Sequence, residues 1–321
     1  MTDSLFNKFT ALLTAPISLI NNPDTRIYYL YLLSSLMIAI SFYFAINTKN
    51  TKASIQELVR YFFPKKIWLH PSSKMDYFIF MFNGILSLVL ITPYIISSAA
   101  IFTFTFKSLK YIFGNPEMFE ISSSSILILY TVSLWLFGDF TRFLAHYLMH
   151  KIPSLWEFHK VHHSAEVLTP LTQYRSHPIE VFIFNLRAVF SVGLITGIFT
   201  YFFSYDLTIL EIIGVNIFRF IFLALGANLR HSHIPLRYGK FLEHIFISPA
   251  QHQIHHSNDP KHFDTNMGSH LAIWDWFFGT LQTAKSGMKL IFGLDQETNQ
   301  DHRNLWKIYL LPFTKIFNSN K

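Results

Sequence analysis

The segments HKVHHS at residues 159–164 and HQIHHS at residues 252–257 are nearly the same motif written twice, and HYLMH at residues 146–150 precedes the first. Residues three and four apart share one face of a helix, so each HxxHH segment directs two or three imidazole rings to one point, and HxxxH directs two more. These three histidine boxes contain half of the chain's 16 histidines. Because neutral imidazole binds iron, copper, zinc and nickel, the boxes predict a polynuclear transition-metal centre.

The composition around the boxes is that of a membrane protein. The 321 residues are 51% apolar and only 14% charged, and apolar runs cover residues 27–46, 77–106, 121–137, 179–203 and 207–229. A helix needs about 20 apolar residues to cross a bilayer core of about 30 Å. The sequence therefore predicts an all-α, polytopic integral membrane protein with about four to five transmembrane helices and a cytosolic helical cap that carries the boxes.

Two of these runs have a short connection. Only Ser204, Tyr205 and Asp206 separate 179–203 from 207–229, which predicts an antiparallel transmembrane hairpin over residues 179–229. Such a hairpin returns the chain to the side it left, so that the boxes lie on one face of the membrane. The longest run, 77–106, contains Pro93, which either kinks one span or divides the run into two shallower segments.

Basic residues predict the orientation. The segment after the first run carries Lys49, Lys52, Arg60, Lys65, Lys66 and Lys74, whereas only Lys8 and Arg26 precede that run. By the positive-inside rule residues 47–76 are cytoplasmic, the N-terminus is on the opposite side and the boxes face the cytoplasm. The net charge of +7 fits loops at anionic lipid headgroups, and no basic stripe with exposed aromatic residues predicts a nucleic-acid partner.

The runs and the boxes together suggest the domain organisation. We expect one membrane-embedded unit with an N-terminal membrane region at 1–120, a catalytic domain at 121–285 that includes the 179–229 hairpin, and a C-terminal tail at 286–321.

Several residues outside the boxes are candidates for the same site. Asp139 lies two helical turns before His146, where its carboxylate could accept the free ring N–H of a ligating histidine; it could equally end a membrane helix as an interfacial charge. His231 closes the hairpin at the face of the boxes and is a candidate additional ligand. His233 diverges from His231 by about 200° on a helix, so only one of the two is expected to ligate.

The remaining polar residues fit structural roles better. We expect His177 and His262 to be structural or surface groups, and ordinary roles also for His70, His244, His270 and His302, which have no partner at ligand spacing. Arg187, Glu211 and Arg219 lie inside apolar runs, where they could line a substrate channel or pack at the ends of the hairpin.

The donor set narrows the choice of metal. There is no cysteine, and no Asp or Glu lies within a box. Eight or nine nitrogens exceed the ligands of one ion, so two metals are expected. A zinc pair would suit hydrolysis and would call for a carboxylate general base close by, as in HExxH, which the boxes lack. Two irons with positions open for dioxygen fit better.

The motifs around the boxes resemble those of the integral-membrane fatty acid hydroxylase / sterol desaturase superfamily. The resemblance covers about residues 130–281. It rests on the three boxes in order and on the surrounding segments DF at 139–140, LWEFHKVHHS at 155–164, HPIE at 177–180, SP at 248–249, QHQIHHS at 251–257 and WDWFFGTL at 274–281.

The resemblance implies a di-iron centre at the cytosolic membrane surface that uses O2 and two electrons on a lipid C–H bond. The implied substrate is a membrane lipid, whether a sterol, fatty acyl, ether lipid or aminolipid, and the membrane is a bacterial inner membrane or the ER. The implied iron ligands are His146, His150, His159, His162, His163, His252, His255 and His256, with His231 as the additional one.

Electrons are expected from outside the chain. The sequence has no HPGG haem-domain signature, so a separate reductase, ferredoxin or pterin is the expected electron donor. Hydroxylation is the expected reaction, and desaturation at the same site is the alternative. A histidine-rich metal transporter is the non-enzyme alternative, but it predicts polar residues within several spans, and the first three apolar runs contain no charge.

Overall fold

The computed structural model describes residue 14 and residues 17–47, 53–86, 97–116, 119–203 and 206–318. The first half of the chain forms η1 (Leu19–Asn21), α2 (Tyr29–Ile46), α3 (Ile55–Phe62), α4 (Lys65–Trp68), α5 (Pro71–Leu86), α6 (Ser98–Phe113), α7 (Ser123–Lys151), α8 (Pro153–His163), η4 (Thr172–Tyr174) and α9 (Pro178–Phe202). The second half forms β1 (Glu211–Ile212), β2 (Val215–Asn216), α10 (Ile217–Ala224), η5 (Ala227–His231), η6 (Leu242–His244), α11 (Pro249–His255), η7 (Pro260–His262), α12 (Ile273–Phe278), α13 (Gln296–Asp301) and α14 (Leu305–Asn318).

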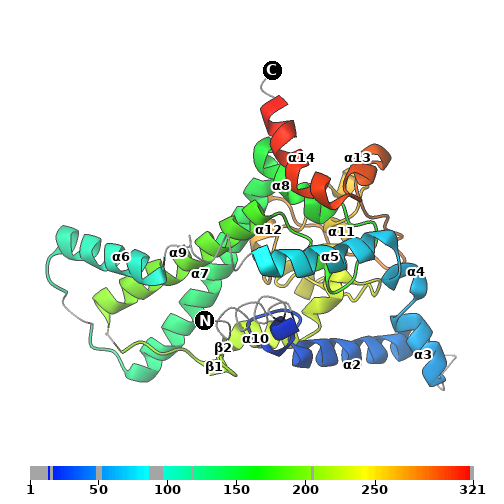
Figure 1. The fold of residues 1–321 in the computed structure, drawn as a ribbon. Helices are drawn as coiled ribbons and strands as arrows, with labels where there is room; N and C mark the ends of the chain where they lie inside the picture. Colours follow the sequence, from blue (N-terminus) through cyan, green and yellow to red (C-terminus); the bar gives the residue numbers. More distant parts are fainter. Residues whose placement is uncertain are drawn as a thin grey trace, which may run out of the picture.

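These elements form an arm and a body. The arm consists of α6, α9 and the first part of α7, and it extends from a rounded body that contains α8, α11 and α12 (Figure 1). Within the described ranges the chain is mostly helical, as predicted, and β1 and β2 form a two-stranded antiparallel sheet.

Among the described residues, three helices are long and apolar enough to cross a membrane: α2, α7 and α9, with 18, 29 and 25 residues. The described residues thus contain fewer candidate spans than the predicted four to five. The 77–106 run contributes to α5 and α6, which have 16 residues each and are short for a crossing of about 30 Å. The segment around Pro93, at 87–96, lies outside the described residues.

The predicted second arm of the 179–229 hairpin is not a membrane helix. Residues Glu211 and Arg219 lie on different elements, β1 and α10, and α10 has only eight residues. Ile213 and Gly214 adopt φ angles of 54° and 75° and turn the chain into a β-hairpin. An apolar run by itself does not distinguish a hairpin followed by a short helix from one long helix. The connecting residues 204–205 lie outside the described ranges.

The chain nevertheless returns towards the body, along α7. The backbone N–H of Leu210 donates to the Thr131 hydroxyl (2.9 Å), and the Asn216 side-chain amide donates to the Thr131 carbonyl (3.0 Å). Further on, the rings of Trp135 and Phe218 stack with centroids 5.0 Å apart. This path carries the chain from the end of α9 to His231.

Helices α7 and α9 form an antiparallel pair. Tyr130 bonds Thr196 and Thr141 bonds Ser191, both at 2.8 Å, so the C-terminal end of α7 lies beside the N-terminal end of α9. The first histidine box occupies that end of α7. The pair therefore brings the box and the start of α9 together at the body.

Two glycines let α6 approach α9 closely. A Cβ atom at Gly193 would lie 2.6 Å from the Ser98 carbonyl oxygen, and one at Gly197 would lie 2.7 Å from the Thr105 Cβ. Small residues four apart are typical of close helix contacts in membranes. The arm is thus packed as a three-helix unit.

A buried ion pair holds the body around α8. The Arg175 Nη1 group lies 2.9 Å from the Asp76 carboxylate, and both side chains are buried. Arg175 also donates to the Val161 carbonyl (3.0 Å) and to the His302 carbonyl (3.1 Å). One guanidinium therefore ties α5, α8 and the C-terminal segment together beside the second histidine box.

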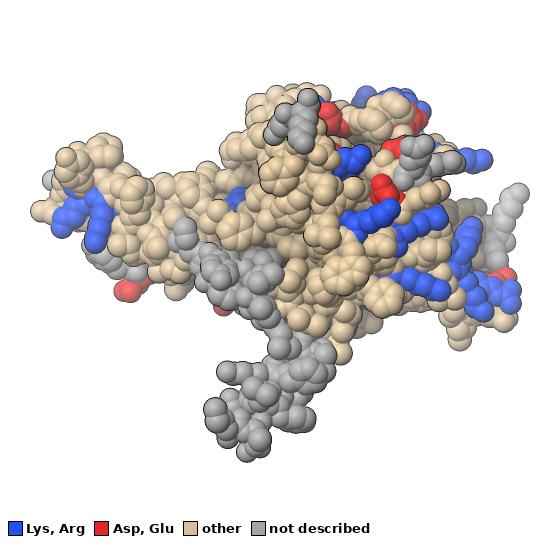
Figure 2. All heavy atoms as spheres, turned by 45° about the horizontal axis from the view of Figure 1, so that its top comes forward, with Lys and Arg blue, Asp and Glu red and all other residues tan. Residues whose placement is uncertain are grey.

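The charged surface is uneven. Figure 2 shows Lys and Arg side chains gathered over the end of the body that carries α3 and α4, whereas the arm is largely uncharged except near the far end of α6. The basic residues of this end include Arg60, Lys65, Lys66 and Lys74. Lys49 and Lys52 lie outside the described residues. The uncharged arm is the surface suited to lipid.

Candidate metal centre

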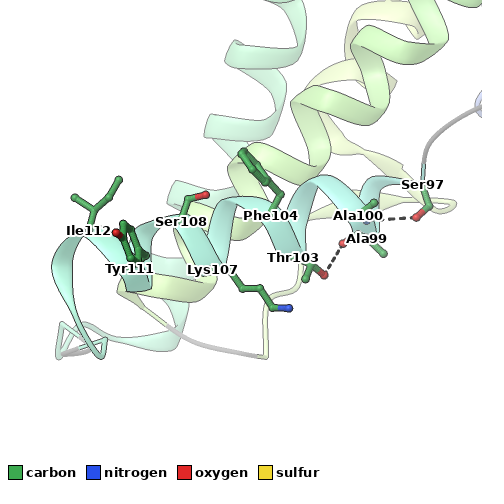
Figure 3. Close-up of a pocket in the computed structure, with 9 residues that line it drawn as sticks. All are labelled: Ser97, Ala99, Ala100, Thr103, Phe104, Lys107, Ser108, Tyr111 and Ile112. Atoms are coloured by element: carbon green, nitrogen blue, oxygen red, sulfur yellow. Dashed lines mark hydrogen bonds between the residues drawn. The ribbon is translucent and has the colours of Figure 1, made fainter.

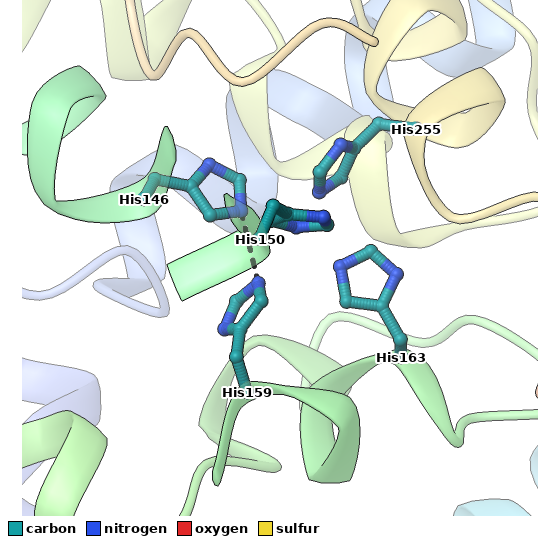
Figure 4. Close-up of side chains that lie close together, drawn as sticks. All are labelled: His146, His150, His159, His163 and His255. Carbon is teal, nitrogen blue, oxygen red and sulfur yellow. Dashed lines mark hydrogen bonds between the residues drawn. The ribbon is translucent and has the colours of Figure 1, made fainter. Parts of the chain in front are cut away.

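Nine histidines converge in the body as two groups. The possible ligand atoms within each group lie within 4.8 Å of one another. We call site A the five residues His146, His150, His159, His163 and His255, and site B the four residues His162, His231, His252 and His256. Figure 4 shows the site A rings pointing toward one another from α7, α8 and α11.

Each HxxHH box divides its histidines between the two sites. His159 and His163, four apart on α8, belong to site A, and His162 belongs to site B. The third box has the reverse arrangement: its i and i+4 members belong to site B and His255 to site A. Residues i and i+4 lie about 40° apart around a helix, while residue i+3 points about 100° away from i+4. Two crossed copies of one local motif therefore make two adjacent sites.

The sites are neighbours. The rings of His163 in site A and His256 in site B stack with centroids 4.6 Å apart. Five and four nitrogen ligands are suitable numbers for two separate ions, in line with the expected metal count.

The nitrogen spacing in site B fits a cation. The Nε2 atoms of His231, His252 and His256 lie 3.1 or 3.2 Å from one another. Each Nε2 is either protonated or bare, so three such atoms cannot form three donor–acceptor pairs. Nitrogens bound to one ion at about 2.1 Å and at right angles would lie about 3.0 Å apart. A shared metal ion therefore explains contacts that hydrogen bonding does not.

Site A shows the same feature. His146 Nδ1 donates to the Met267 carbonyl (2.7 Å), and His159 Nδ1, 3.1 Å from the Glu180 carboxyl group, donates to its oxygen. Both Nε2 atoms are then bare, yet they lie 3.0 Å apart. Two lone pairs at this distance repel unless a cation lies beside both.

Three further nitrogens of site A are unpaired among the described residues. The Nε2 atoms of His150, His163 and His255 are buried and without a hydrogen-bond partner among the described residues. An unpaired buried polar atom is costly, and metal coordination removes that cost. The residues present thus fit the metals that the boxes predict.

Burial keeps the rings available for metal. It lowers the pKa of His159, His163 and His252 well below the ordinary value, and it lowers the pKa of His162 to about 4. A neutral imidazole retains the lone pair that binds a metal ion, so the boxes are competent ligands at neutral pH.

A ring of acceptors orients the site A histidines. His255 Nδ1 donates to the Thr265 carbonyl (2.8 Å), and His150 Nδ1 lies 3.5 Å from the Asp264 carboxylate. With Met267 and Glu180, these groups hold Nδ1 and leave Nε2 directed inward. Such outer partners set the tautomer and raise the basicity of a ligand.

The predicted contact of Asp139 with a box histidine is not formed. Its carboxylate accepts the backbone N–H groups of His270 and Leu271 (both 3.0 Å) and the Trp274 indole N–H (3.1 Å). Seven residues extend about 10 Å along a helix, which is too far for an Asp side chain to reach His146. Asp139 instead anchors the loop that carries Met267, the acceptor of His146.

Glu180 is the carboxylate that the sequence argument missed. It is 3% exposed and lies on the first turn of α9 against His159. The argument against zinc relied on the absence of a nearby carboxylate, and Glu180 and Asp264 remove that basis. The available signal was the HPIE segment, which places an acidic residue at the start of a membrane helix.

The other histidines lie outside both sites. His177 caps α9 by accepting from the Ile179 N–H (3.1 Å), and His233 Nε2 donates to the Tyr61 carbonyl (2.7 Å). His262 is buried with both ring nitrogens unpaired among the described residues, but it belongs to neither group. His231, in contrast, lies in site B, at the position proposed for an additional ligand.

Cavities reach the sites from two directions. One, of about 360 Å³, is lined by five histidines: His146, His159, His162, His231 and His252. Another, of about 550 Å³, is lined by His150, His163, His255, His256 and Trp156 among others. A hollow of about 930 Å³ also lies along α6, but Lys107 is the single charged residue that lines it and no histidine does (Figure 3). The first two cavities are therefore the candidate routes for reactants.

The chain is similar in sequence to several known proteins. Residues 131–280 match the family model described as fatty acid hydroxylase. The chain is 34% identical over 143 residues to the ornithine lipid hydroxylase OlsE of Rhizobium tropici, covering 44% of this chain and 39% of that protein. It is 28% identical over 192 residues to the alkylglycerol monooxygenase of Caenorhabditis elegans, covering 56% and 34%. The human alkylglycerol monooxygenase is 24% identical over 189 residues, covering 59% and 38%.

The matches cover only part of these relatives. The chain spans between about a third and two fifths of the length of the curated relatives it matches. No solved structure matches the chain.

The two sites predict the metal content. Purified protein is expected to contain about two transition-metal ions per chain, one for each group of ligands. His231→Ala removes one of four ligands of site B and is expected to lower the content toward one ion. His302→Ala is the control, because His302 bonds the Thr298 carbonyl outside both sites. Elemental analysis measures both. One ion in the unmodified protein, or two retained in His231→Ala, would contradict the two-site assignment.

Glu180 and Asp139 are expected to differ in effect. Glu180→Gln replaces the carboxyl group behind His159 with an amide and is expected to weaken metal affinity about 10–100-fold, measured by competition with a chelator. Asp139→Asn keeps the box rings in contact with their own acceptors. It is expected to lower the midpoint of thermal unfolding and to reduce the metal affinity less than Glu180→Gln does. Glu57→Gln, which replaces an exposed carboxylate on α3 and can keep its capping contact with Ser54, serves as control. Equal affinity losses in the Glu180 and Asp139 variants would refute the separate roles.

Proposed function

We propose that this chain, whose residues 131–280 belong to the fatty acid hydroxylase family, is a membrane-bound, O2-dependent oxidoreductase that hydroxylates a lipid C–H bond at a di-iron centre. The observation that carries the proposal is the pair of adjacent, buried groups of neutral imidazoles. All nine proposed ligands belong to these groups. The relatives named as hydroxylase and monooxygenases support the reaction class.

Iron is proposed because the reaction requires a redox change. Imidazole sites accept zinc as well as iron, and the donor set does not separate them. Zinc is redox-inert and does not activate dioxygen, whereas non-haem iron does. Two iron ions bound in sites A and B would supply the electron-transfer chemistry with O2 that hydroxylation requires.

The overall reaction sets the need for an electron donor. One C–H bond, O2, two electrons and two protons yield one C–OH group and one water. The chain contains no cysteine for an iron–sulfur cluster. We therefore propose a separate electron donor: a reductase, a ferredoxin or a pterin.

The protein's own groups position the reactants. Glu180 holds the His159 ring with Nε2 toward site A, and Met267 does the same for His146. The cavity of about 360 Å³ contacts histidines of both sites, so a C–H bond held there lies next to both. Apolar helices of the arm supply the route by which a lipid chain can enter from the bilayer. Desaturation at the same site would differ in one respect: a second hydrogen would be removed from the lipid, and no oxygen atom would be added to it.

A membrane lipid is the proposed substrate. The described residues include three candidate membrane helices; α7 ends at the histidine sites and α9 begins beside them. The relatives are named for an ornithine lipid and for alkylglycerols, which supports a lipid of the same broad kind.

Lipid mass spectrometry tests the activity. Extracts of cells that express the protein are expected to contain a lipid about 16 Da heavier than one in null cells, the mass of one oxygen atom inserted into a C–H bond. The His162→Ala variant, which loses a ligand of site B, is the inactive control. A lipid about 2 Da lighter would identify the desaturase alternative instead. No lipid change in cells with iron-loaded protein and reductant would refute both.

The active site is proposed to face the cytoplasm. The basic residues of α3 to α5 lie on the body that also holds the histidines, and positive charge favours the cytoplasmic side (Figure 2). The membrane is a bacterial inner membrane or, in a eukaryote, the ER. Cytosolic NAD(P)H and ferredoxin could then supply electrons.

Reporter fusions test this orientation. A reporter after Lys321 is expected to read cytoplasmic, and one inserted near Gly114, at the far end of the arm, is expected to read external. A third reporter before α2 tests the predicted crossing of that helix. Its external reading would support the crossing, whereas a cytoplasmic reading would show that α2 lies along the body. A reporter after Lys321 that reads external would overturn the cytoplasmic site.

A further inference from the structure

We propose that a pocket of arginines next to the histidine sites binds the anionic group, a phosphate or a carboxylate, of an amphiphilic lipid substrate. The arginine pocket is a cavity of about 350 Å³ between α7, α9, the β1–β2 hairpin and α10. It is lined by Arg26, Arg142, Arg187 and Arg219 among other residues. This inference deepens the proposed function, on which it rests, by naming a substrate class.

The arginine pocket adjoins the cavity at the metal sites. Asp24, Arg26 and Arg142 line both cavities. An anionic group bound by Arg26 and Arg142 would therefore lie directly beside the space in front of the histidines. The carbon that reacts would then lie near the anionic group of the lipid.

The residues that line the pocket supply too few negative charges to balance its arginines. Four guanidinium groups line the pocket with two carboxylates, Asp24 and Asp139. The Asp139 carboxylate already accepts three N–H groups, from His270, Leu271 and Trp274. Asp24 is 3.8 Å from Arg219, and its side chain is 63% exposed. The pocket therefore keeps a net positive charge.

Arg142 is the least satisfied of the four. It forms no hydrogen bond or ion pair with any residue that the structure describes, and its guanidinium stacks over the Phe184 ring at 4.8 Å. It belongs to the candidate membrane helix α7. A charged residue at such a place is expensive and usually serves a polar ligand.

Arg187 and Arg26 have only neutral partners. Arg187 Nη1 donates to the Gly138 carbonyl (2.8 Å) and the Thr141 hydroxyl (3.0 Å), and its buried Nε–H has no partner among the described residues. Arg26 Nη2 donates to the Ser269 hydroxyl (2.9 Å). Burial and then the charges of Arg230, Arg142 and Arg219 lower the pKa of Arg26 well below its ordinary value. These cations repel one another, and a bound anion would relieve the repulsion.

The guanidinium group selects the chemistry of the ligand. Its planar fork of N–H donors matches the oxygens of phosphate and carboxylate, and such charge-assisted bonds are about twice as strong as neutral ones. A neutral diacylglycerol or a hydrocarbon would leave the donors unpaired. The pocket therefore favours an anionic or zwitterionic lipid.

Equilibrium binding tests the inference without turnover. The full-length, metal-loaded protein is placed in neutral detergent without reductant and titrated with radiolabelled phosphatidic acid, with diacylglycerol of the same acyl chains, and with inorganic phosphate. Phosphatidic acid is expected to bind at least about tenfold more tightly than diacylglycerol, as one charge-assisted contact of ordinary strength provides.

Matched variants locate the binding. Arg142→Gln and Arg187→Gln are each expected to weaken phosphatidic acid binding about tenfold or more while leaving metal content unchanged. Arg60→Gln, which removes an exposed charge from α3, is expected to change it less than about twofold, since exposed single charges contribute little. Thermal unfolding shows whether each variant is folded. If one of the two variants does not fold, the other still tests the pocket.

The outcomes separate the proposals. Equal binding of phosphatidic acid and diacylglycerol, or equal losses in Arg60→Gln and Arg142→Gln, would overturn the arginine pocket. Tight binding of phosphate without phosphatidic acid would show a soluble anion site and overturn the lipid assignment. Specific binding without an oxidised product would leave the pocket standing and refute the hydroxylase. A neutral lipid as the hydroxylated product would support the hydroxylase and overturn the arginine pocket.

Discussion

The structure depends on buried imidazole rings whose nitrogen atoms converge. The rings carry too few N–H protons to join all of these nitrogens in hydrogen bonds. In site B three Nε2 atoms lie 3.1 or 3.2 Å apart, and in site A two bare Nε2 atoms lie 3.0 Å apart. Lone pairs this close repel, and burial opposes protonation of the rings. A cation bound in each group would attract these lone pairs and so remove the repulsion between them. Metal binding and the packing of α7, α8, α11 and η5 are therefore expected to be coupled.

The surrounding structure orients the rings through acceptors that are themselves fixed. Glu180 lies in the first turn of α9, so the antiparallel packing of α7 and α9 determines where the acceptor of His159 lies. Met267, the acceptor of His146, lies on a loop held by two buried carboxylates: Asp139 binds His270 and Leu271, and Asp275 binds the Met267 N–H (2.7 Å). The arm thus contributes to the metal sites as well as to the membrane contact.

The same helix ends connect the metal sites with the arginine pocket. Arg142 precedes His146 by one turn on α7, and Arg187 follows Glu180 by two turns on α9. Moving toward the arm along either helix therefore leads from the histidines to guanidinium groups and then to an uncharged surface. This order suits an amphiphile whose charged group is bound beside the metals and whose chain extends toward lipid.

The sequence alone predicted that the histidines of the boxes converge, because residues three and four apart on a helix share a face regardless of the rest of the fold. Composition likewise predicted the membrane helices α2, α7 and α9. The division of each HxxHH box between two sites was decided only by the way in which the rings of α8 and α11 face each other, and Glu180 reached His159 only because α9 packs against α7. The β1–β2 turn was hidden within an apolar run, since hydrophobicity reports burial or lipid contact and not backbone conformation. Local periodicity therefore identified the candidate ligands, whereas long-range packing, which no local pattern encodes, decided what each of these side chains faces.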